Sequence, residues 1–148
     1  NFKLLPPLRG SDDRAALLEG VKDGSIDHLV SNHQPVNFDH KYCEFGLAQP
    51  GALGLQTAVL LSLELFDLDV VSRAWSTGIR EAFGLQVAHI EEGRPAEISL
   101  IALNQPSVFK RSDNLSISSN SPLFDRSFQH TVAGIINNNK FKIRITRS

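Results

Sequence analysis

The sequence predicts an α/β fold in which helices and one strand come first and a β-rich segment follows. Three observations predict it: a capped amphipathic helix leads into a short apolar strand, a long apolar segment follows, and the last third of the chain alternates apolar and polar residues. The 148 residues are 41% hydrophobic and 21% charged, which is ordinary for a globular domain. We expect the boundary between the two parts near residues 84–95.

The first expected helix covers residues 12–23. Ser11 stands before Asp12 and Asp13, so a hydroxyl can cap the first turn and two acids lie at the positive end of the helix dipole. Gly24 then supplies a residue that readily takes the left-handed conformation at a helix end. The face expected to pack on the core carries Ala15, Leu17, Leu18 and Val21.

A strand is expected over residues 26–31, and it ends in a polar turn, Asn-His-Gln-Pro, at residues 32–35. Residues 37–54 are rich in Asn, Asp, Gly and Pro and are expected to form a loop. Loops at strand ends often carry functional residues. This turn is therefore the first candidate site.

A buried helix is expected over residues 55–66, which are apolar on most sides. Two shorter helices are expected over 68–76 and 79–83, the second closed by Gly84.

The β-rich part begins after Gly93-Arg94-Pro95. It is expected to contain a strand over 97–103, an irregular Ser/Asn-rich segment over 112–127, and a hairpin of 132–137 and 140–145 joined by the turn Asn138-Asn139.

A series of short motifs is distinctive as a set. They are Lys3-Leu4-Leu5-Pro6-Pro7-Leu8-Arg9, Asp23-Gly24-Ser25-Ile26-Asp27, Asn32-His33-Gln34-Pro35, Gln49-Pro50-Gly51-Ala52-Leu53-Gly54-Leu55-Gln56-Thr57, Ala82-Phe83-Gly84-Leu85, Ile90-Glu91-Glu92-Gly93-Arg94-Pro95-Ala96-Glu97 and Ser121-Pro122-Leu123-Phe124. In this order they resemble the carboxyl-terminal part of the dihydroorotases, metal-dependent amidohydrolases of pyrimidine biosynthesis. The resemblance spans nearly all of the chain.

The resemblance implies a fold as well as a family. Residues 1–90 are expected to be the last units of a (β/α)₈ TIM-type barrel of the amidohydrolase kind, and residues 91–148 the carboxyl-terminal part of a small β-sandwich domain. The chain has no methionine, and we expect it to be a fragment. In the family the metal-binding His-x-His, the bridging carboxylated Lys and two further His ligands lie on earlier strands. No metal site is therefore expected in this chain, although active family members use zinc.

The resemblance also places a catalytic position, and the residue there is changed. The family's general base is an Asp at the end of the last barrel strand, and Asn32 stands at that position. A carboxamide cannot take up a proton near neutral pH and brings no negative charge to a cation. This change is expected to nearly abolish the usual mechanism.

Other site positions follow from the same comparison. Leu5 stands where the family has a substrate-binding Asn, and Val36 where it has a second His, so two polar contacts to the pyrimidine have become apolar. Pro50 and Gly51 keep the family's substrate loop, a feature that the backbone path explains as easily as a ligand does. His33 and Arg9 are expected to be structural residues near the site.

Two functional hypotheses remain open at this point. The first is a non-catalytic dihydroorotase-like protein that serves as a scaffold, of the kind that accompanies aspartate transcarbamoylase in some bacteria. The alternative is part of an active zinc-dependent dihydroorotase or related cyclic amidohydrolase that interconverts N-carbamoyl-aspartate and dihydroorotate. An independent binding module is disfavoured, because one barrel strand with a few helices leaves apolar faces uncovered. We expect those faces to bind the missing barrel part or to self-associate.

Composition argues against nucleic-acid binding and against a membrane-spanning segment. A net charge of −1 gives no basic surplus for nucleic acid, and no apolar stretch approaches the ~20 residues of a membrane-spanning helix. The lone Cys43 allows no internal disulfide and is a weak candidate nucleophile, and the cytoplasm is the expected location. A new metal site is not expected from the remaining histidines, which are His28, His40, His89 and His130.

Overall fold

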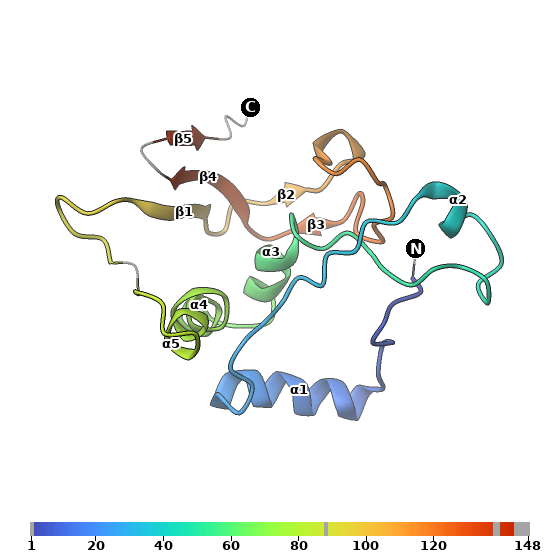
Figure 1. The fold of residues 1–148 in the computed structure, drawn as a ribbon, viewed down its shortest axis with the longest axis horizontal. Helices are drawn as coiled ribbons and strands as arrows, with labels where there is room; N and C mark the ends of the chain where they lie inside the picture. The colour runs from blue at the N-terminus through green and yellow to red at the C-terminus, as the bar shows by residue number, and fades with distance from the viewer. Residues whose placement is uncertain (1, 88, 138–139, 144–148) are drawn as a thin grey trace.

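A computed structural model describes residues 2–87, 89–137 and 140–143. Helices occupy the first half of the chain and small antiparallel sheets the second (Figure 1). The helical elements are α1 (Ser11–Asp23), α2 (Phe38–Lys41), α3 (Ala58–Leu63), α4 (Leu68–Ser72), the π-helical turn η1 (Arg73–Thr77), α5 (Gly78–Ala82) and the 3₁₀ turn η2 (Arg111–Asp113). The strands are β1 (Glu97–Ala102), β2 (Ser107–Val108), β3 (Ser127–Phe128), β4 (Thr131–Asn137) and β5 (Lys140–Ile143). The predicted α/β class and the order of its two parts are confirmed.

Helix α1 agrees with its prediction in length and in its end. Gly24 closes it in the left-handed conformation, at φ 86°. The predicted serine cap is wrong: Gly10 is the residue before the helix, and the Ser11 hydroxyl donates to the Asp12 carboxylate instead. The predicted core face is also only partly correct, because Val21 is buried while Leu17 is 53% exposed.

Residues 68–82 form one uninterrupted helical run where the sequence predicts two helices. Gly78 lies inside this run with helical backbone angles, φ −61° and ψ −39°. A Cβ there would stand 3.0 Å from the Arg73 carbonyl oxygen, so glycine permits close packing at this point and does not break the helix. The predicted helix over 55–66 is shorter than expected, since residues before Ala58 form a turn around the Gly54 carbonyl.

The predicted strand over residues 26–31 is wrong. Among the described residues this segment has no neighbouring strand, and its main-chain bonds go to other elements: the Ile26 N–H donates to the Gly20 carbonyl and the Leu29 N–H to that of Ala74. A strand is defined by a ladder with a neighbour. The nearest pairing is a single parallel bridge between His33 and Ala52.

Two small antiparallel sheets build the second half. The three-stranded sheet has the order β1-β4-β5, with a bulge between Leu100 and Ile101, and β2 pairs with β3. The predicted strand and hairpin are thereby confirmed within the described residues, whereas the turn at Asn138-Asn139 and the end of the second hairpin strand lie outside them. Sequence reasoning missed β2, β3 and α2 because segments of two to four residues carry no periodicity.

The best-formed apolar core joins α3 to the β2–β3 region. Leu60, Phe109 and Phe128 are buried together, with Leu61, Leu123, Phe124 and Val132 packed against them. This core connects the two halves, because Leu60 belongs to α3 and Phe128 to β3.

Candidate functional site

Two segments run side by side at the predicted site, residues 31–36 and 50–55, and are called the loop pair below. The Gln34 N–H donates to the Ala52 carbonyl at 2.9 Å, within the parallel bridge between His33 and Ala52. A glycine lets the segments approach closely: a Cβ on Gly54 would lie 2.4 Å from the Ser31 carbonyl oxygen. The sequence therefore brings the predicted turn and the predicted substrate loop together.

Asn32 uses both ends of its side chain in hydrogen bonds. Its Nδ2 donates to the Leu5 carbonyl at 3.1 Å, and its Oδ1 accepts from the Gln34 Nε2 at 2.9 Å. Its backbone has φ 41°, a left-handed conformation that asparagine tolerates better than most residues. The donated bond requires an N–H group, and an ionised carboxylate at this position has none.

His33 holds the far end of the loop pair. Its Nδ1 accepts the backbone N–H groups of Gly54 and Leu55, both at 3.2 Å. Two donors on Nδ1 require a neutral imidazole with its proton on Nε2. His33 therefore bonds two backbone amides of the second segment.

The remaining predicted positions separate into those at the loop pair and those away from it. Residues 3–5 contact both segments of the loop pair. Asn32 donates to the Leu5 carbonyl, and the Gly51 N–H donates to the Lys3 carbonyl at 3.0 Å. The Leu5 side chain is 62% exposed, whereas Val36 and Gly51 are buried. Pro50, next to Gly51, is partly buried, and Arg9 is exposed and takes no part in these contacts.

A partly buried lysine lies beside the site. The Lys41 ammonium donates to the Lys3 carbonyl at 3.3 Å. Burial lowers the pKa of Lys41 below its usual value, and the positive charge of Lys3 lowers it further. The neighbouring Cys43 is an exposed free thiol.

Metal-ligating side chains do not gather anywhere in the described part of the chain, where no three His, Cys, Asp or Glu residues are close enough to hold an ion. His28, His40, His89 and His130 do not form such a group there. None of the helices in the described residues combines the length and the hydrophobicity that a membrane-spanning helix requires.

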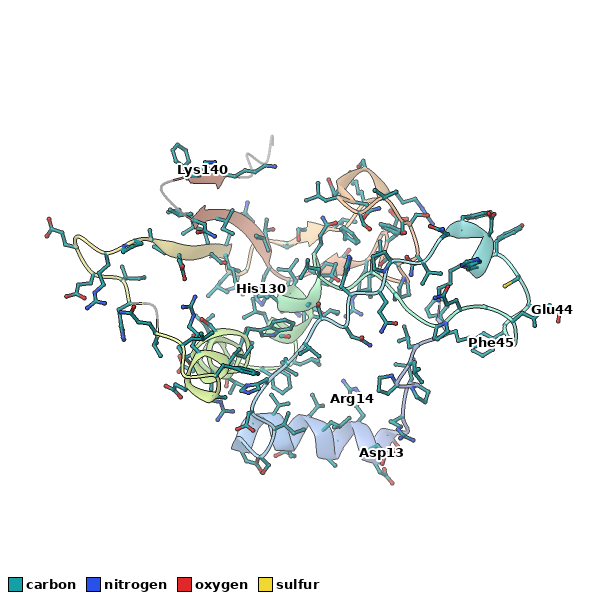
Figure 2. The ribbon with its side chains drawn as sticks, viewed as in Figure 1. Asp13, Arg14, Glu44, Phe45, His130 and Lys140 are labelled. Atoms are coloured by element: carbon teal, nitrogen blue, oxygen red, sulfur yellow. The ribbon has the colours of Figure 1, made fainter. Side chains whose placement is uncertain are left out.

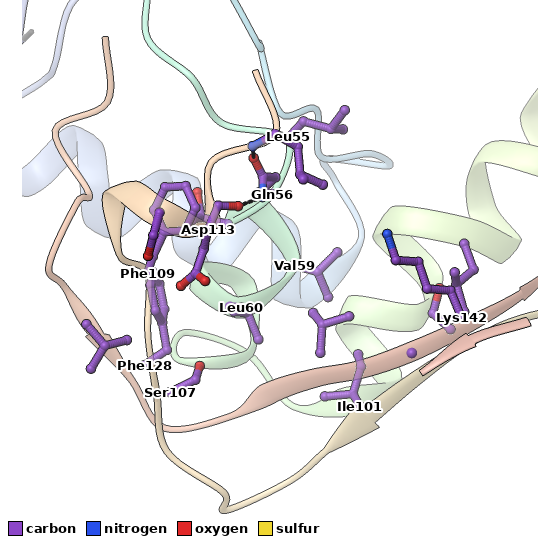
Figure 3. Close-up of a pocket in the computed structure, with 18 residues that line it drawn as sticks. Leu55, Gln56, Val59, Leu60, Ile101, Ser107, Phe109, Asp113, Phe128 and Lys142 are labelled. Atoms are coloured by element: carbon purple, nitrogen blue, oxygen red, sulfur yellow. Dashed lines mark hydrogen bonds between the residues drawn. The ribbon is translucent and has the colours of Figure 1, made fainter. Parts of the chain in front are cut away.

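A hollow of about 610 Å³ lies between α3 and the two sheets (Figure 3). Its lining is mostly apolar, and Gln56 borders it, accepting the Leu115 N–H and donating to the Asp113 carbonyl. None of the predicted site residues is among the described residues that line it. Leu55, at the end of the loop pair, does border it, so the hollow adjoins the loop pair at that residue.

Sequence reasoning missed one residue that contacts both segments of the loop pair. Asn120 is 3% exposed, and its side chain bonds backbone groups in residues 34–36 and at Gly51. It lies in the segment predicted to be irregular, just before the Ser-Pro-Leu-Phe motif. The only signal was this proximity, since no local pattern reveals contacts made 69 to 86 residues away.

Known proteins are similar to this chain over most of its length. The chain is 38% identical over 131 residues to the dihydroorotase of Bacillus subtilis, a match that covers 82% of the chain and 30% of that protein. It is 34% identical over 146 residues to the dihydroorotase of Aquifex aeolicus, with 95% of the chain and 34% of that protein covered. The chain is a homologue of the dihydroorotases. This dihydroorotase homologue spans about a third of the length of the curated relatives it matches.

Solved structures agree at the level of the fold. Residues of the dihydroorotase homologue superpose on a D-hydantoinase (dihydropyrimidinase) from Thermus sp. with a TM-score of 0.83 at 18% identity, covering 97% of the chain and 34% of that structure. An L-hydantoinase (dihydropyrimidinase) from Arthrobacter aurescens gives 0.79 at 21% identity, over 97% and 35%. No protein-family model matches the chain.

Proposed function

We propose that this dihydroorotase homologue has a structural, non-catalytic function in a dihydroorotase-like protein of pyrimidine biosynthesis. In this proposal residues 1–90 are the last units of a (β/α)₈ barrel and residues 91–148 part of a small β domain. The similarity to dihydroorotases over most of the chain supports the pathway, and the likeness to hydantoinase structures supports the fold.

The proposal rests on the hydrogen bonds of the Asn32 side chain. Its Nδ2 donates to the Leu5 carbonyl, so the side chain contributes an N–H that a general base lacks. Its Oδ1 accepts from Gln34. The residue at the position of the family's proton acceptor is therefore engaged as a hydrogen-bonded link between main-chain segments.

Zinc chemistry, which active family members use, does not fit the described residues of this chain by themselves. The described residues form no group of three ligands, and Asn32 carries no negative charge. We derive no catalytic step through a metal from these residues.

The apolar surface around the candidate site supports a need for a partner. Leu5, Leu8, Leu17 and Val30, which lie on or near α1 and the segment after it, are all exposed. We propose that the remaining part of a dihydroorotase-like barrel covers this surface, or a second copy in its absence. We propose aspartate transcarbamoylase as a further partner, because the resemblance to non-catalytic dihydroorotase-like proteins implies it.

The test is an assay of the full-length protein with dihydroorotate and with N-carbamoyl-aspartate. We expect no turnover by the natural protein, and none after Asn32→Asp, because Leu5 and Val36 also replace polar substrate contacts. Asn37→Asp is the matched control for an added negative charge, since Asn37 lies exposed at the start of α2.

Each result has a distinct meaning. Turnover by the natural protein contradicts the proposal and favours the active cyclic amidohydrolase. If Asn32→Asp alone restores turnover, the changes at Leu5 and Val36 have not abolished substrate binding, and this part of the proposal is contradicted. General acid–base catalysis is worth about 10²–10⁴-fold, so recovery on this scale is readily measured. Zinc analysis after reconstitution provides a second readout, and a metal-free protein excludes the active alternative.

A further inference from the structure

The buried Asn120 side chain connects two segments that are distant from it in sequence. Its Oδ1 accepts the Val36 N–H at 3.1 Å, and its Nδ2 donates to the carbonyls of Gln34 at 2.9 Å and Gly51 at 3.1 Å. Its own backbone carbonyl accepts the Leu53 N–H at 3.1 Å. One residue thus binds both segments of the loop pair from the β-rich part of the chain.

The hydrogen-bonding capacity of this carboxamide matches its surroundings. Both donors on Nδ2 are used, and the oxygen accepts a bond. An apolar residue of similar size would leave three main-chain groups without their partner, and a buried polar group without a partner is costly. A carboxylate would keep the acceptor and lose both donors.

Asn120 acts at one end of the loop pair and His33 at the other. His33 bonds the amides of Gly54 and Leu55. Asn120 bonds backbone groups of residues 34 and 36 in the first segment and of residues 51 and 53 in the second. The two contacts enclose the single parallel bridge between His33 and Ala52. This bridge is too short to fix the spacing of the segments by itself.

We infer that Asn120 is a positioning residue, which sets the separation and orientation of the two segments that carry Asn32, Val36 and Gly51. The geometry of the candidate site is thereby determined by the β-rich part of the chain. The inference goes beyond the proposed function, because it applies to the loop pair whether or not the protein catalyses a reaction.

Backbone amide exchange in the full-length protein tests the inference without any substitution. The Val36 and Leu53 amides both bond to Asn120, so one opening event frees both. We expect the two amides to exchange slowly and at the same opening rate. Two unrelated rates, or exchange as fast as in exposed loops, would overturn the inference even if no variant folds.

Asn120→Asp tests it through the two donated bonds. At neutral pH the carboxylate cannot donate to Gln34 and Gly51, and we expect exchange at Val36 and Leu53 to accelerate about 30- to 100-fold, as for the loss of two buried hydrogen bonds. At lower pH the protonated carboxyl regains one donor, so the ratio of variant to natural exchange rates is expected to fall. A purely stabilising residue would not produce this pH-dependent, local recovery.

Asn114→Asp is the matched control. The Asn114 side chain also makes three hydrogen bonds to backbone groups, but only with Ser116 and Ser118 in its own segment. We expect it to leave exchange at Val36 and Leu53 unchanged. Equal acceleration in both variants, or uniform acceleration along the whole chain in Asn120→Asp, would contradict a positioning function. Turnover in the enzyme assay would contradict the proposed function and leave this result unaffected.

Discussion

Helix α1 and the loop pair differ in how each is held to the rest of the molecule. Helix α1 is a regular 13-residue element, yet Val21 is the residue that it buries, and the helix lies along one side of the molecule in Figure 1. The loop pair has a single backbone bridge between its segments, and it buries Val36, Gly51 and Leu53.

The two regions differ in where their main-chain hydrogen-bonding groups find partners. A helix pairs many of its own main-chain N–H and C=O groups, so α1 needs few outside partners for them. Irregular segments need partners elsewhere for buried N–H and C=O groups, and in the loop pair Asn120 and His33 supply them. We therefore expect the loop pair to be sensitive to single substitutions and α1 to respond only locally.

The largest effect is expected from Gly54→Ala. The new Cβ would lie 2.4 Å from the Ser31 carbonyl oxygen, a backbone atom that cannot move without separating the loop pair. We expect a loss of about 2–3 kcal/mol in the free energy of unfolding, as for other cases of overpacking. Denaturant titration of the full-length protein measures it.

Gly46→Ala is its control. Gly46 lies in the loop between α2 and Pro50, and a Cβ there meets no atom within 4 Å. A change within about 0.5 kcal/mol is expected, as at other surface positions. Equal losses in the two variants would show that the contact between Ser31 and Gly54 does not hold the segments together.

A smaller and local effect is expected from Arg73→Met. The Arg73 guanidinium donates to the carbonyls of Val21 and Lys22 and so ties the end of α1 to the long helical run. Its loss is expected to cost about 1 kcal/mol. Faster amide exchange is expected in α1, with Val36 and Leu53 unchanged.

Arg14→Met is the control for the loss of one positive charge, because Arg14 lies exposed on α1 (Figure 2). No change in the exchange of the last turn of α1 is expected. Acceleration in the loop pair after Arg73→Met would show that α1 and the loop pair are coupled and not held independently.

The smallest effect concerns acid stability at the end of α1. The Ser25 backbone N–H donates to the Asp23 carboxylate at 2.8 Å, and this bond lowers the pKa of Asp23 below 3.8. Because the folded pKa is the lower one, ionised Asp23 stabilises the fold above pH 3.8, and the contribution is lost as the pH falls through the folded value.

Asp23→Asn removes this titration, so stability is expected to fall slightly less steeply below pH 3.8. Urea midpoints measured across this range give the slope. The same change at the exposed Asp39 of α2 controls for the removal of one negative charge. A steeper slope in Asp23→Asn would contradict the sign of the effect.

Much of the architecture was predictable because its signals are local. The stop of α1 at Gly24 follows from glycine's tolerance of positive φ, and β1 and β4 follow from apolar and polar alternation. The expected strand over residues 26–31 failed for the opposite reason, since a strand needs a neighbour and the described chain offers none. The expected division into helices 68–76 and 79–83 failed because Gly78 keeps helical backbone angles within one continuous run.

The candidate site divides in the same way. The sequence by itself determined that Asn32 lacks a titratable group, because residue chemistry is independent of folding. The tertiary structure decided that Asn32 bonds Leu5, that His33 accepts two amides, and that Asn120 holds the loop pair. Those bonds join residues 21 to 86 positions apart, and only the folded chain brings their donors and acceptors within reach.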